Sequence, residues 1–566
     1  MTGAGHVRKK IGQHRVAAPC MRASYDNGVS ATPLLGETVA ENLDRTTAVH
    51  PEALALVSRH QHLRYTYTEL NDSVDAVARG LLAAGLERGD RLGLWSPNCA
   101  EWVMVQYAAA KVGAVLVNLN PGYRQSEVEH ALNTAETVLL IAATTFKGSD
   151  YVVMAEAARS SVASLRRVVH LETPGWEEFV SDGDALPNPA VSDRMDFVEF
   201  DDPASIQFTS GTTGAPKGTT LTHHNILNNA YFIAEGLRYT EADRVCIPVP
   251  FYHNFGMVLG NLGCTTHGSC IVIPSASFDA GAVLDAIDGE RCTSLYGVPT
   301  MFIAELEHPR LASADLSSLR TGIMAGSPCP IELMKRVCGR LHIPEIAICY
   351  GMTESSSVTT QTALTDSLER RVTTVGKVHP HVEIKVVDPD SGRVVTRGKP
   401  GELLTRGYNV MLGYWNDPER TRATIDPQRW LHTGDVATMD ADGYVNVVGR
   451  IKDMIIRGGE NIFPSEIEQF LHTHADVVDA AVVGVPDERY GEQVLAWIIP
   501  RAGMRLTEAA IQDYCRGQIA HFKVPRYVRF TDVFPETVTG KTRKVVLREL
   551  AVDALGLGAE HAEPSA

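Results

Sequence analysis

The apolar positions of this chain switch repeatedly between the spacing of a helix and the spacing of a strand. One helix face is marked by residues at intervals of three and four, namely Leu70, Val74, Val77 and Leu81. Gly85 is suited to end that helix, and residues 91–95 then predict a strand. Farther along, residues 205–208 predict a short strand, and Thr222 is suited to cap a helix with an apolar face. This strand–loop–helix alternation predicts an α/β architecture.

The pattern changes near residue 450, where shorter elements follow one another. Ser465 is placed to cap a helix, and a further helix is predicted over residues 507–515. Residues 480–485 and 528–530 predict strands, so a separate α+β unit of about 110 residues fits here. We therefore predict a disordered tail over residues 1–32, a large N-terminal domain over 33–449 and a small C-terminal domain over 450–566.

Composition and charge narrow the class of protein. The 566 residues exceed one ordinary core, and 44% hydrophobic with 21% charged residues fits a globular protein. A net charge of −16 argues against nucleic-acid and anionic-membrane partners, and no apolar run approaches the roughly 18 residues of a membrane span. The ten cysteines lack any CxxC pair, which indicates reduced thiols and a cytoplasmic protein. The basic N-terminus lacks the apolar region of a secretory signal peptide. The sequence leaves open whether the protein forms a homodimer.

The densest chemical signal is a ten-residue run of glycines, hydroxyl groups and one lysine. It consists of Thr209, Ser210, Gly211, Thr212, Thr213, Gly214, Ala215, Pro216, Lys217 and Gly218. Glycines let a backbone turn tightly, and backbone N–H groups, hydroxyls and an ammonium group together suit a polyphosphate. The spacing does not fit a Walker A loop. Taken alone, the run could also be a flexible turn.

The run resembles the phosphate loop of the adenylate-forming superfamily, which includes acyl-CoA synthetases, luciferases and peptide-synthetase adenylation domains. The resemblance covers nearly the whole chain through further motifs at residues 206–208, 325–328, 350–354, 411–415, 430–435, 449–461 and 540–541. The chain looks most similar to medium-chain acyl-CoA synthetases of the ACS-family-member-2 type. The resemblance implies ATP, Mg2+ and coenzyme A, a carboxylic acid substrate, and a small mobile C-terminal domain.

The same resemblance assigns the nucleotide and metal roles. It implies that Tyr350 stacks on adenine, that Thr353 contacts the α-phosphate, and that Glu354 holds Mg2+, for which a carboxylate is a suitable ligand. It further places Gly326 and Ser327 along the adenine. It places Asp435 and Arg450 on the ribose hydroxyls. From the residues alone, the loop with Gly326 and Ser327 is alternatively a plain turn, and Asp435 with Arg450 is alternatively a structural ion pair.

The C-terminal region carries the remaining implied roles. By resemblance, Lys541 reaches the carboxylate and the α-phosphate, where a cation stabilises developing negative charge. Lys452 matches the hinge between domains, and Gly458 with Gly459 matches the passage for the pantetheine arm of coenzyme A. By sequence alone, the alternatives are a solvated surface lysine for Lys541, a linker lysine for Lys452, and a hairpin turn for Gly458 with Gly459.

A mostly apolar set is the candidate acyl pocket, as a fatty tail requires. The set is His253, Phe255, Gly256, Met257, Tyr296, Val298, Met324 and Cys349. His253 is either a gate to the carboxylate or a hydrogen-bonded core histidine. We expect an acyl-CoA synthetase, with an aryl-acid ligase and a carrier-protein-loading enzyme as alternatives. A non-catalytic acyl-nucleotide-binding protein is disfavoured because Glu354, Asp435 and Lys541 are all present.

Overall fold

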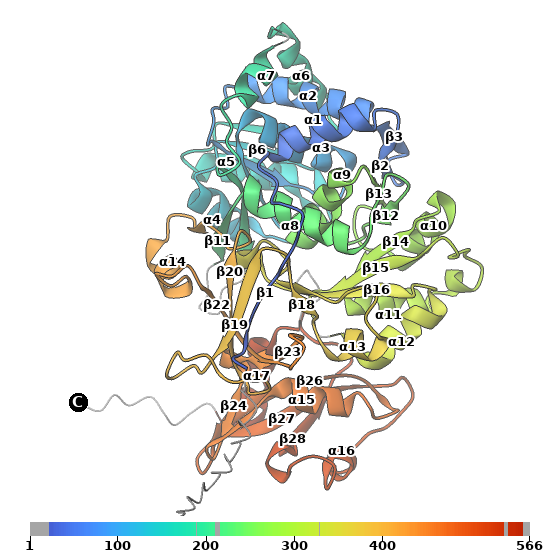
Figure 1. Ribbon diagram of the computed structural model, residues 1–566, viewed down its shortest axis with the longest axis vertical. Coiled ribbons are helices and arrows are strands. Elements are labelled where there is room, and N and C mark those ends of the chain that lie inside the picture. The colour runs from blue at the N-terminus through green and yellow to red at the C-terminus, as the bar shows by residue number, and fades with distance from the viewer. Residues whose placement is uncertain (1–21, 188, 210–215, 328, 537–541, 558–566) are drawn as a thin grey trace, which may run out of the picture.

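Two large, mainly parallel sheets form the body of the protein, and the described residues also form two five-stranded sheets and one two-stranded sheet. The computed structural model describes residues 22–187, 189–209, 216–327, 329–536 and 542–557. In Figure 1 the elements from β24 (Ile455–Arg457) onward, deep orange to red, lie below the two large sheets. The predicted α/β class, with a large N-terminal and a smaller C-terminal domain, is confirmed.

Strand order defines the two large sheets. The nine-stranded sheet runs β18 (Lys377–Val378), β17 (Thr360–Gln361), β16 (Glu345–Tyr350), β15 (Thr321–Ala325), β14 (Ser294–Gly297), β12 (Arg244–Cys246), β13 (Cys270–Ile273), β2 (Leu54–Ser58) and β3 (Leu63–Thr66). The seven-stranded sheet runs β21 (Gly413–Tyr414), β11 (Lys217–Thr222), β10 (Pro203–Thr209), β5 (Val115–Asn118), β4 (Arg91–Trp95), β6 (Leu139–Ala142) and β9 (Arg167–His170).

Helices lie between the two sheets and on both outer faces. The shared core takes its helical side chains mainly from α1 (Val39–Val49), α2 (Tyr67–Ala83), α3 (Ala100–Val112) and α8 (His223–Gly236). The outer face of the nine-stranded sheet packs on α10 (Ala280–Glu290), α11 (Pro299–Glu307) and α12 (Ile331–Arg340). The outer face of the seven-stranded sheet packs on α4 (Gln125–Ala135) and α5 (Tyr151–Ser161). Both sheets are thus covered on two faces, as parallel strands require.

The strongest sequence patterns correspond to the observed elements. The predicted strand at 91–95 coincides with β4, and the helix predicted around Leu70–Leu81 is α2. The Thr222 hydroxyl accepts a hydrogen bond from the Asn225 N–H at 3.0 Å, and the Asn225 side chain accepts one from the Thr222 N–H at 2.9 Å. This reciprocal cap satisfies donors that the first turn of α8 leaves without helical partners.

The N-terminal segment is more ordered than predicted. A third sheet runs β1 (Tyr25–Asn27), β19 (Val382–Val387), β20 (Gly401–Gly407), β22 (Leu431–Met439) and β23 (Val445–Arg450). Residues 25–27, which we expected within a disordered tail, pair antiparallel with β19. Residues 1–21 lie outside the described part. The tail prediction failed here because an edge strand this short gives no periodic signal.

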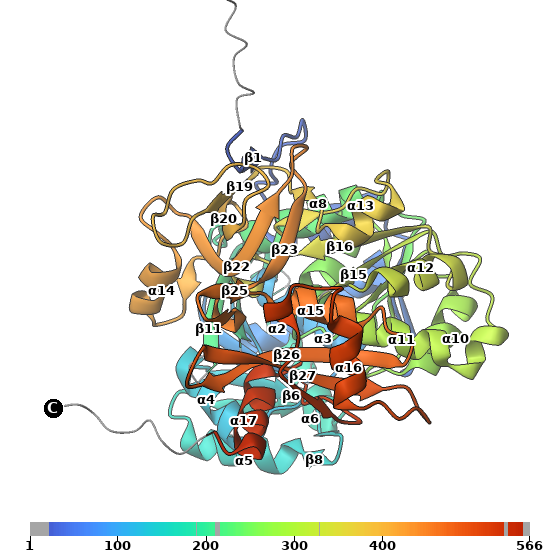
Figure 2. The same ribbon diagram turned by 90° about the horizontal axis from the view of Figure 1, so that it is seen from below.

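A small sheet organises the C-terminal domain. It contains β25 (Glu460–Ile462), β24 (Ile455–Arg457), β27 (Gly491–Pro500), β26 (Val477–Asp487) and β28 (Tyr527–Phe530). Figure 2 shows α15 (Pro464–Leu471) and α17 (Lys544–Leu555) on opposite sides of β26. Helix α16 (Glu508–Cys515) shares the α15 side. The exact boundary near residue 450 stays a prediction.

The predicted cap of α15 is wrong. The cap position is occupied by Phe463, and Pro464 begins the helix. Proline is favoured at the first helical position because its missing N–H would have no helical partner there. The Ser465 hydroxyl instead donates to the carbonyl of Val448 in β23. This serine therefore ties the small domain to the third sheet.

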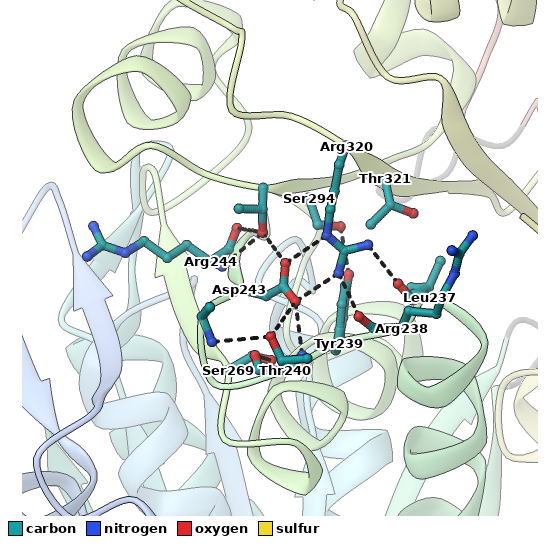
Figure 3. Close-up of polar contacts among 12 residues, drawn as sticks. Leu237, Arg238, Tyr239, Thr240, Asp243, Arg244, Ser269, Ser294, Arg320 and Thr321 are labelled. Atoms are coloured by element: carbon teal, nitrogen blue, oxygen red, sulfur yellow. Dashed lines mark hydrogen bonds and ion pairs between the residues drawn. The ribbon is translucent and has the colours of Figure 1, made fainter.

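A buried charge cluster joins α8, β12 and the start of β15 (Figure 3). The Arg320 guanidinium donates to both Asp243 carboxylate oxygens, at 3.0 and 2.8 Å. Thr293 Oγ1 also donates to this carboxylate, at 2.6 Å, as does the Thr240 N–H, at 2.9 Å. Burial raises the pKa of Asp243, but these donors outweigh it, so the net pKa lies below the usual range.

We predict that Asp243→Ala lowers the free energy of unfolding by about 2–4 kcal/mol, because Arg320 loses its partner in a largely buried setting. The matched control is Asp315→Ala, which breaks the Arg291–Asp315 pair whose side chains are 54% and 55% exposed; exposed pairs contribute only about 0–1 kcal/mol. Urea unfolding above and below the usual carboxyl pKa of about 3.9 measures both variants. The wild-type advantage should be present above that pH and fall as pH drops through the lowered pKa. Equal losses in the two variants at neutral pH would contradict the account.

Candidate functional site

One group of predicted site residues lies where strands of the nine-stranded sheet end. β14, β15 and β16 are parallel neighbours, so their carboxyl ends share one edge. That edge collects Tyr296 and Val298, Gly326 and Ser327, and Cys349 with Tyr350. Ligands of parallel α/β sheets gather at this edge.

Tyr350 and the third sheet meet at the same edge. The Tyr350 phenol donates to the Asp435 carboxylate at 2.6 Å, and Arg450 Nε lies 3.2 Å from the other carboxylate oxygen. Asp435 and Arg450 are opposite one another in the antiparallel pair of β22 and β23. Asp435 is buried, while the Arg450 side chain is 51% exposed. The ion pair that the sequence offered as an alternative is therefore present.

Burial, reinforced by the neighbouring Asp435 carboxylate, raises the pKa of Tyr350 well above its usual value. The phenol therefore keeps its proton and acts as a donor to Asp435. A carboxylate only accepts hydrogen bonds and has about four lone-pair positions, a chemistry that suits a diol such as a ribose.

A second polar set lies around Glu354. Its carboxylate accepts a hydrogen bond from the Tyr414 phenol at 2.9 Å, and the Lys217 ammonium lies 4.9 Å from the centre of the Tyr414 ring. Thr353 and Glu354 share the short helical turn that follows β16. Burial and the adjacent Glu354 raise the pKa of Tyr414. The fold thus brings one carboxylate and one ammonium group to opposite parts of the same tyrosine.

The glycine-rich run joins two strands of the seven-stranded sheet. Thr209 at the end of β10 pairs with Lys217 at the start of β11. His130 Nε2 lies 3.3 Å from the carbonyl of Pro216. The predicted residues Ser210, Gly211, Thr212, Thr213, Gly214 and Ala215 lie outside the described residues, as does Lys541. Their roles stay predictions.

Lys452 lies immediately after β23, in the turn Ile451–Asp453. Burial lowers the pKa of its ammonium group, and the cations of Arg450 and Lys217 act in the same direction, while the carboxylates of Asp453 and Asp435 oppose them. Lys452 was predicted as a hinge, a role of its backbone. Its side chain also lies near the Tyr350–Asp435–Arg450 set and near Lys217 of the second polar set. Its hinge role stays a prediction.

Most of the candidate acyl residues form one apolar cluster. Phe255 stacks on Tyr296 with ring centres 5.6 Å apart, and the same cluster includes Met257, Val298 and Cys349. Phe255, Gly256 and Met257 begin a π-helix over Phe255–Leu262, a type of turn frequent at functional sites. Gly256 is required there, since a Cβ would lie 2.4 Å from the Pro250 carbonyl oxygen.

Two methionines differ in where they lie. Met324 belongs to the cluster on the outer face of the nine-stranded sheet, because side chains alternate along β15. The structure therefore separates Met324 from the other acyl candidates, and its neighbours Ile323 and Ala325 lie on their side instead. Met257 sulfur accepts a hydrogen bond from the Asn118 amide at 3.1 Å.

The loop residues take conformations that explain their identity. Gly326 has φ +93°, and a Cβ there would lie 3.1 Å from Val298, so the adenine and acyl candidates are adjacent. Gly458 and Gly459 have φ +59° and +88° and form the turn of the β24–β25 hairpin. His253 Nδ1 accepts a hydrogen bond from the Phe255 N–H at 3.1 Å at the start of the π-helix.

A hollow of about 550 Å3 lies elsewhere, beside the third sheet, and none of the predicted site residues lines it. Two of its arginines already have partners: Arg370 pairs with Asp442 at 2.6 Å and Arg397 with Asp26 at 3.1 Å. This hollow is therefore not part of the candidate site.

Sequence reasoning missed two contributors to the site. Tyr414 lies in the motif at residues 411–415, but no role was predicted for it, because its partner Glu354 is 60 residues away in the sequence. The Tyr239 phenol, which contacts Tyr296 at 3.0 Å, was not singled out. A buried tyrosine gives no signal in the sequence of which distant residue its phenol contacts, so neither contact could be found from spacing.

Comparison with known proteins agrees with this geometry. A family model described as AMP-binding enzyme matches residues 43–415, and one described as AMP-binding enzyme C-terminal domain matches residues 466–541. The chain belongs to the AMP-binding enzyme family. It is 46% identical to the medium-chain acyl-CoA ligase ACSF2, mitochondrial, of Danio rerio, over 95% of this chain and 92% of that protein. It is 43% identical to the putative acyl-CoA synthetase YngI of Bacillus subtilis (strain 168), over 93% and 99%.

A solved structure of this family extends the comparison to three dimensions. The anthranilate CoA ligase AuaEII in complex with anthranoyl-AMP superposes with a TM-score of 0.83 at 28% identity, covering 93% of this chain and 99% of that one. The match includes both domains. In the described part of the chain, none of the helices has the length and apolar character that crossing a membrane requires.

For this AMP-binding enzyme we predict that Asp435→Ala weakens AMP binding by roughly 5- to 150-fold, because an unpaired buried polar group costs about 1–3 kcal/mol. Isothermal titration calorimetry with AMP measures the effect. Asp442→Ala is the matched control, since that carboxylate follows β22 in the same hairpin and is 62% exposed. An unchanged Kd in folded Asp435→Ala would make Asp435 purely structural.

Proposed function

We propose that this protein is an ATP-dependent acyl-CoA synthetase that joins a medium-chain fatty acid to coenzyme A with release of AMP and diphosphate. The observation that carries the proposal is the adjacency of the polar Tyr350–Asp435–Arg450 set and the apolar Phe255–Tyr296 cluster at one sheet edge. The full-length similarity to acyl-CoA ligases supports the same reaction.

The first half-reaction activates the acid. A carboxylate oxygen attacks the α-phosphorus of ATP, the bond from that phosphorus to the bridging oxygen breaks, and diphosphate leaves. The product is a mixed anhydride of the acid and AMP. We propose that Asp435 and Arg450 hold the ribose, that the run 209–217 holds the phosphates, and that Lys541 stabilises the negative charge that develops.

The second half-reaction uses the anhydride. The thiol sulfur of coenzyme A attacks the acyl carbon, the carbon–oxygen bond to AMP breaks, and the thiol proton passes to water. Gly458 and Gly459 would line the approach of the thiol arm. Because Lys541 and this hairpin belong to one small domain yet serve different steps, we propose a rotation of that domain about Lys452.

Mg2+ fits the donors near the proposed phosphate position. Proteins often bind this ion through one or two carboxylates together with substrate phosphates. Glu354 supplies one carboxylate, oriented by the Tyr414 phenol. Among the described residues no group of three or more His, Cys, Asp or Glu could hold a metal alone, which agrees with an ion that arrives with the nucleotide and neutralises part of its charge.

The acyl chain and the setting of the protein are the finer parts of the proposal. A medium-chain acid is favoured by the 46% identity to a medium-chain ligase, whereas the anthranilate ligase is 28% identical. Diphosphate release across acids from acetate to stearate, with benzoate and anthranilate, tests this choice. A cytoplasmic location is proposed from the cysteine content, although the Danio rerio relative is named as mitochondrial; microscopy of a tagged chain tests it. Analytical ultracentrifugation tests a homodimer.

We predict opposite defects from two variants of the proposed mobile domain. Lys541→Ala should lose about 10²- to 10³-fold in acyl-AMP formation and still convert supplied acyl-AMP and coenzyme A to thioester. Lys452→Pro should keep diphosphate release and lose thioester formation, because proline fixes φ near about −65° and prevents the rotation.

Both half-reactions are measured on each variant, with circular dichroism to confirm folding. Lys544→Ala is the control, because Lys544 pairs with Glu468 at 2.6 Å inside the small domain and should leave both steps near wild type. If Lys541→Ala loses both steps equally, the assignment of Lys541 to adenylation is wrong. If Lys452→Pro retains both steps, the rotation about Lys452 is not needed.

A further inference from the structure

Two buried tyrosines face each other beneath the candidate acyl residues. The Tyr239 phenol donates to the Tyr296 oxygen at 3.0 Å, and the Tyr296 phenol donates to the carbonyl of Leu259 at 3.2 Å. The Tyr239 oxygen also lies 2.6 Å from Ser294 Oγ. Tyr296 is fully buried and Tyr239 is 4% exposed.

The Leu259 carbonyl, which is the last acceptor in this series, fixes the direction of the hydrogen bonds. A carbonyl can only accept, so the Tyr296 proton points to Leu259. Tyr239 then uses its single proton on Tyr296, and Ser294 must donate to Tyr239. The chain Ser294, Tyr239, Tyr296, Leu259 leaves no phenol proton without an acceptor, which buried polar groups require.

The chain ends on the element that carries the other acyl candidates. Leu259 lies in the π-helix over Phe255–Leu262, and Phe255 of the same helix stacks on the Tyr296 ring. Burial raises the pKa of Tyr296, and the thiol of Cys349 is among the groups close enough to contribute. Tyr296 belongs to the same apolar cluster as the candidate pocket residues Phe255, Met257 and Cys349.

The segment before Tyr239 is also held in place. Arg320 donates to the carbonyls of Leu237 and Arg238 at 3.0 and 2.8 Å while it pairs with Asp243 (Figure 3). The Arg320 guanidinium carbon lies 5.9 Å from the centre of the Tyr239 ring. The charge cluster thus fixes the backbone from which Tyr239 reaches Tyr296.

We propose that the Tyr296 ring is the closed end of the acyl pocket and that Tyr239 is the positioning residue that keeps it there, so that this pair limits the length of the acyl chain. The inference rests on the proposed function and goes beyond it by naming what sets the substrate class. An acyl chain that fits meets a ring face on which no polar atom is left without a partner.

The magnitudes explain why the limit would be sharp. Each added buried methylene improves binding by about fourfold. Moving the Tyr296 ring breaks two hydrogen bonds, each worth about two- to twelvefold, and also disturbs the Phe255 stack. One more methylene cannot compensate for this loss, so the preference should fall abruptly at the length that reaches the ring.

The test is the chain-length profile of kcat/KM, measured as diphosphate release with saturated acids from butanoate to hexadecanoate. Tyr296→Phe keeps the ring but frees it, and Tyr296→Leu removes most of it. Both should raise the ratio of long-acid to short-acid kcat/KM by about tenfold, with an unchanged KM for ATP. Tyr239→Phe should cause a smaller shift in the same direction, and adding it to Tyr296→Phe should cause no further shift.

Tyr151→Phe is the matched control, because its buried phenol donates to the Pro121 carbonyl in the separate apolar cluster on the outer face of the seven-stranded sheet. It should lower thermal stability as the other variants do and leave the profile unchanged. An unchanged profile in both Tyr296 variants overturns the inference, and a further shift on adding Tyr239→Phe to Tyr296→Phe overturns the role of Tyr239. If wild type activates none of the acids, the proposed function fails and this inference fails with it.

Discussion

The hydrogen bond from the Tyr350 phenol to Asp435 is the contact on which the rest of the site depends. It joins the end of β16 in the nine-stranded sheet to β22 in the third sheet, across 85 residues of sequence. Burial makes the contact costly to lose, since either partner alone would be an unpaired polar group in the interior. The β22–β23 register then places Arg450 opposite Asp435, and the chain continues directly into Lys452. One contact thus holds the proposed ribose site and the segment that leads into the small domain.

Local charge has to work against the charge of the whole chain. The protein carries a net charge of −16, whereas ATP is an anion. Screening limits the reach of exposed charges to about 8–10 Å at physiological salt, so nearby cations decide binding. We propose that Lys217, Arg450 and Lys452 supply them. Burial lowers the pKa of Lys452, and repulsion from the other two cations adds to that effect. A bound nucleotide would relieve that repulsion, and ATP binding should therefore raise the pKa of this lysine.

Much of the fold and part of the site could be predicted from the sequence because the responsible interactions are local. The spacing of apolar residues located α2, β4 and α8, and the Thr222 cap follows from its own chemistry. Motif resemblance assigned Tyr350, Asp435 and Arg450 to the nucleotide, and the structure brings the three into contact, while their roles stay predictions. Sheet pairing, by contrast, depends on partners far away: β1 was missed, Ser465 bonds Val448 instead of capping its helix, and Met324 faces away from the other acyl candidates. The Tyr239–Tyr296 pair likewise exists only once β14 and the π-helix are in place.

The central claim is that the acid is activated as an acyl-adenylate, and isotope transfer tests it most directly. A medium-chain acid labelled with oxygen-18 in both carboxyl oxygens is incubated with the enzyme, ATP, Mg2+ and coenzyme A, and the AMP is analysed by mass spectrometry. The account predicts one labelled oxygen in each AMP formed, because the carboxylate oxygen that attacks the α-phosphorus stays with the phosphate when the thiol attacks the acyl carbon. AMP that carries no label, formed in step with the thioester, would contradict it.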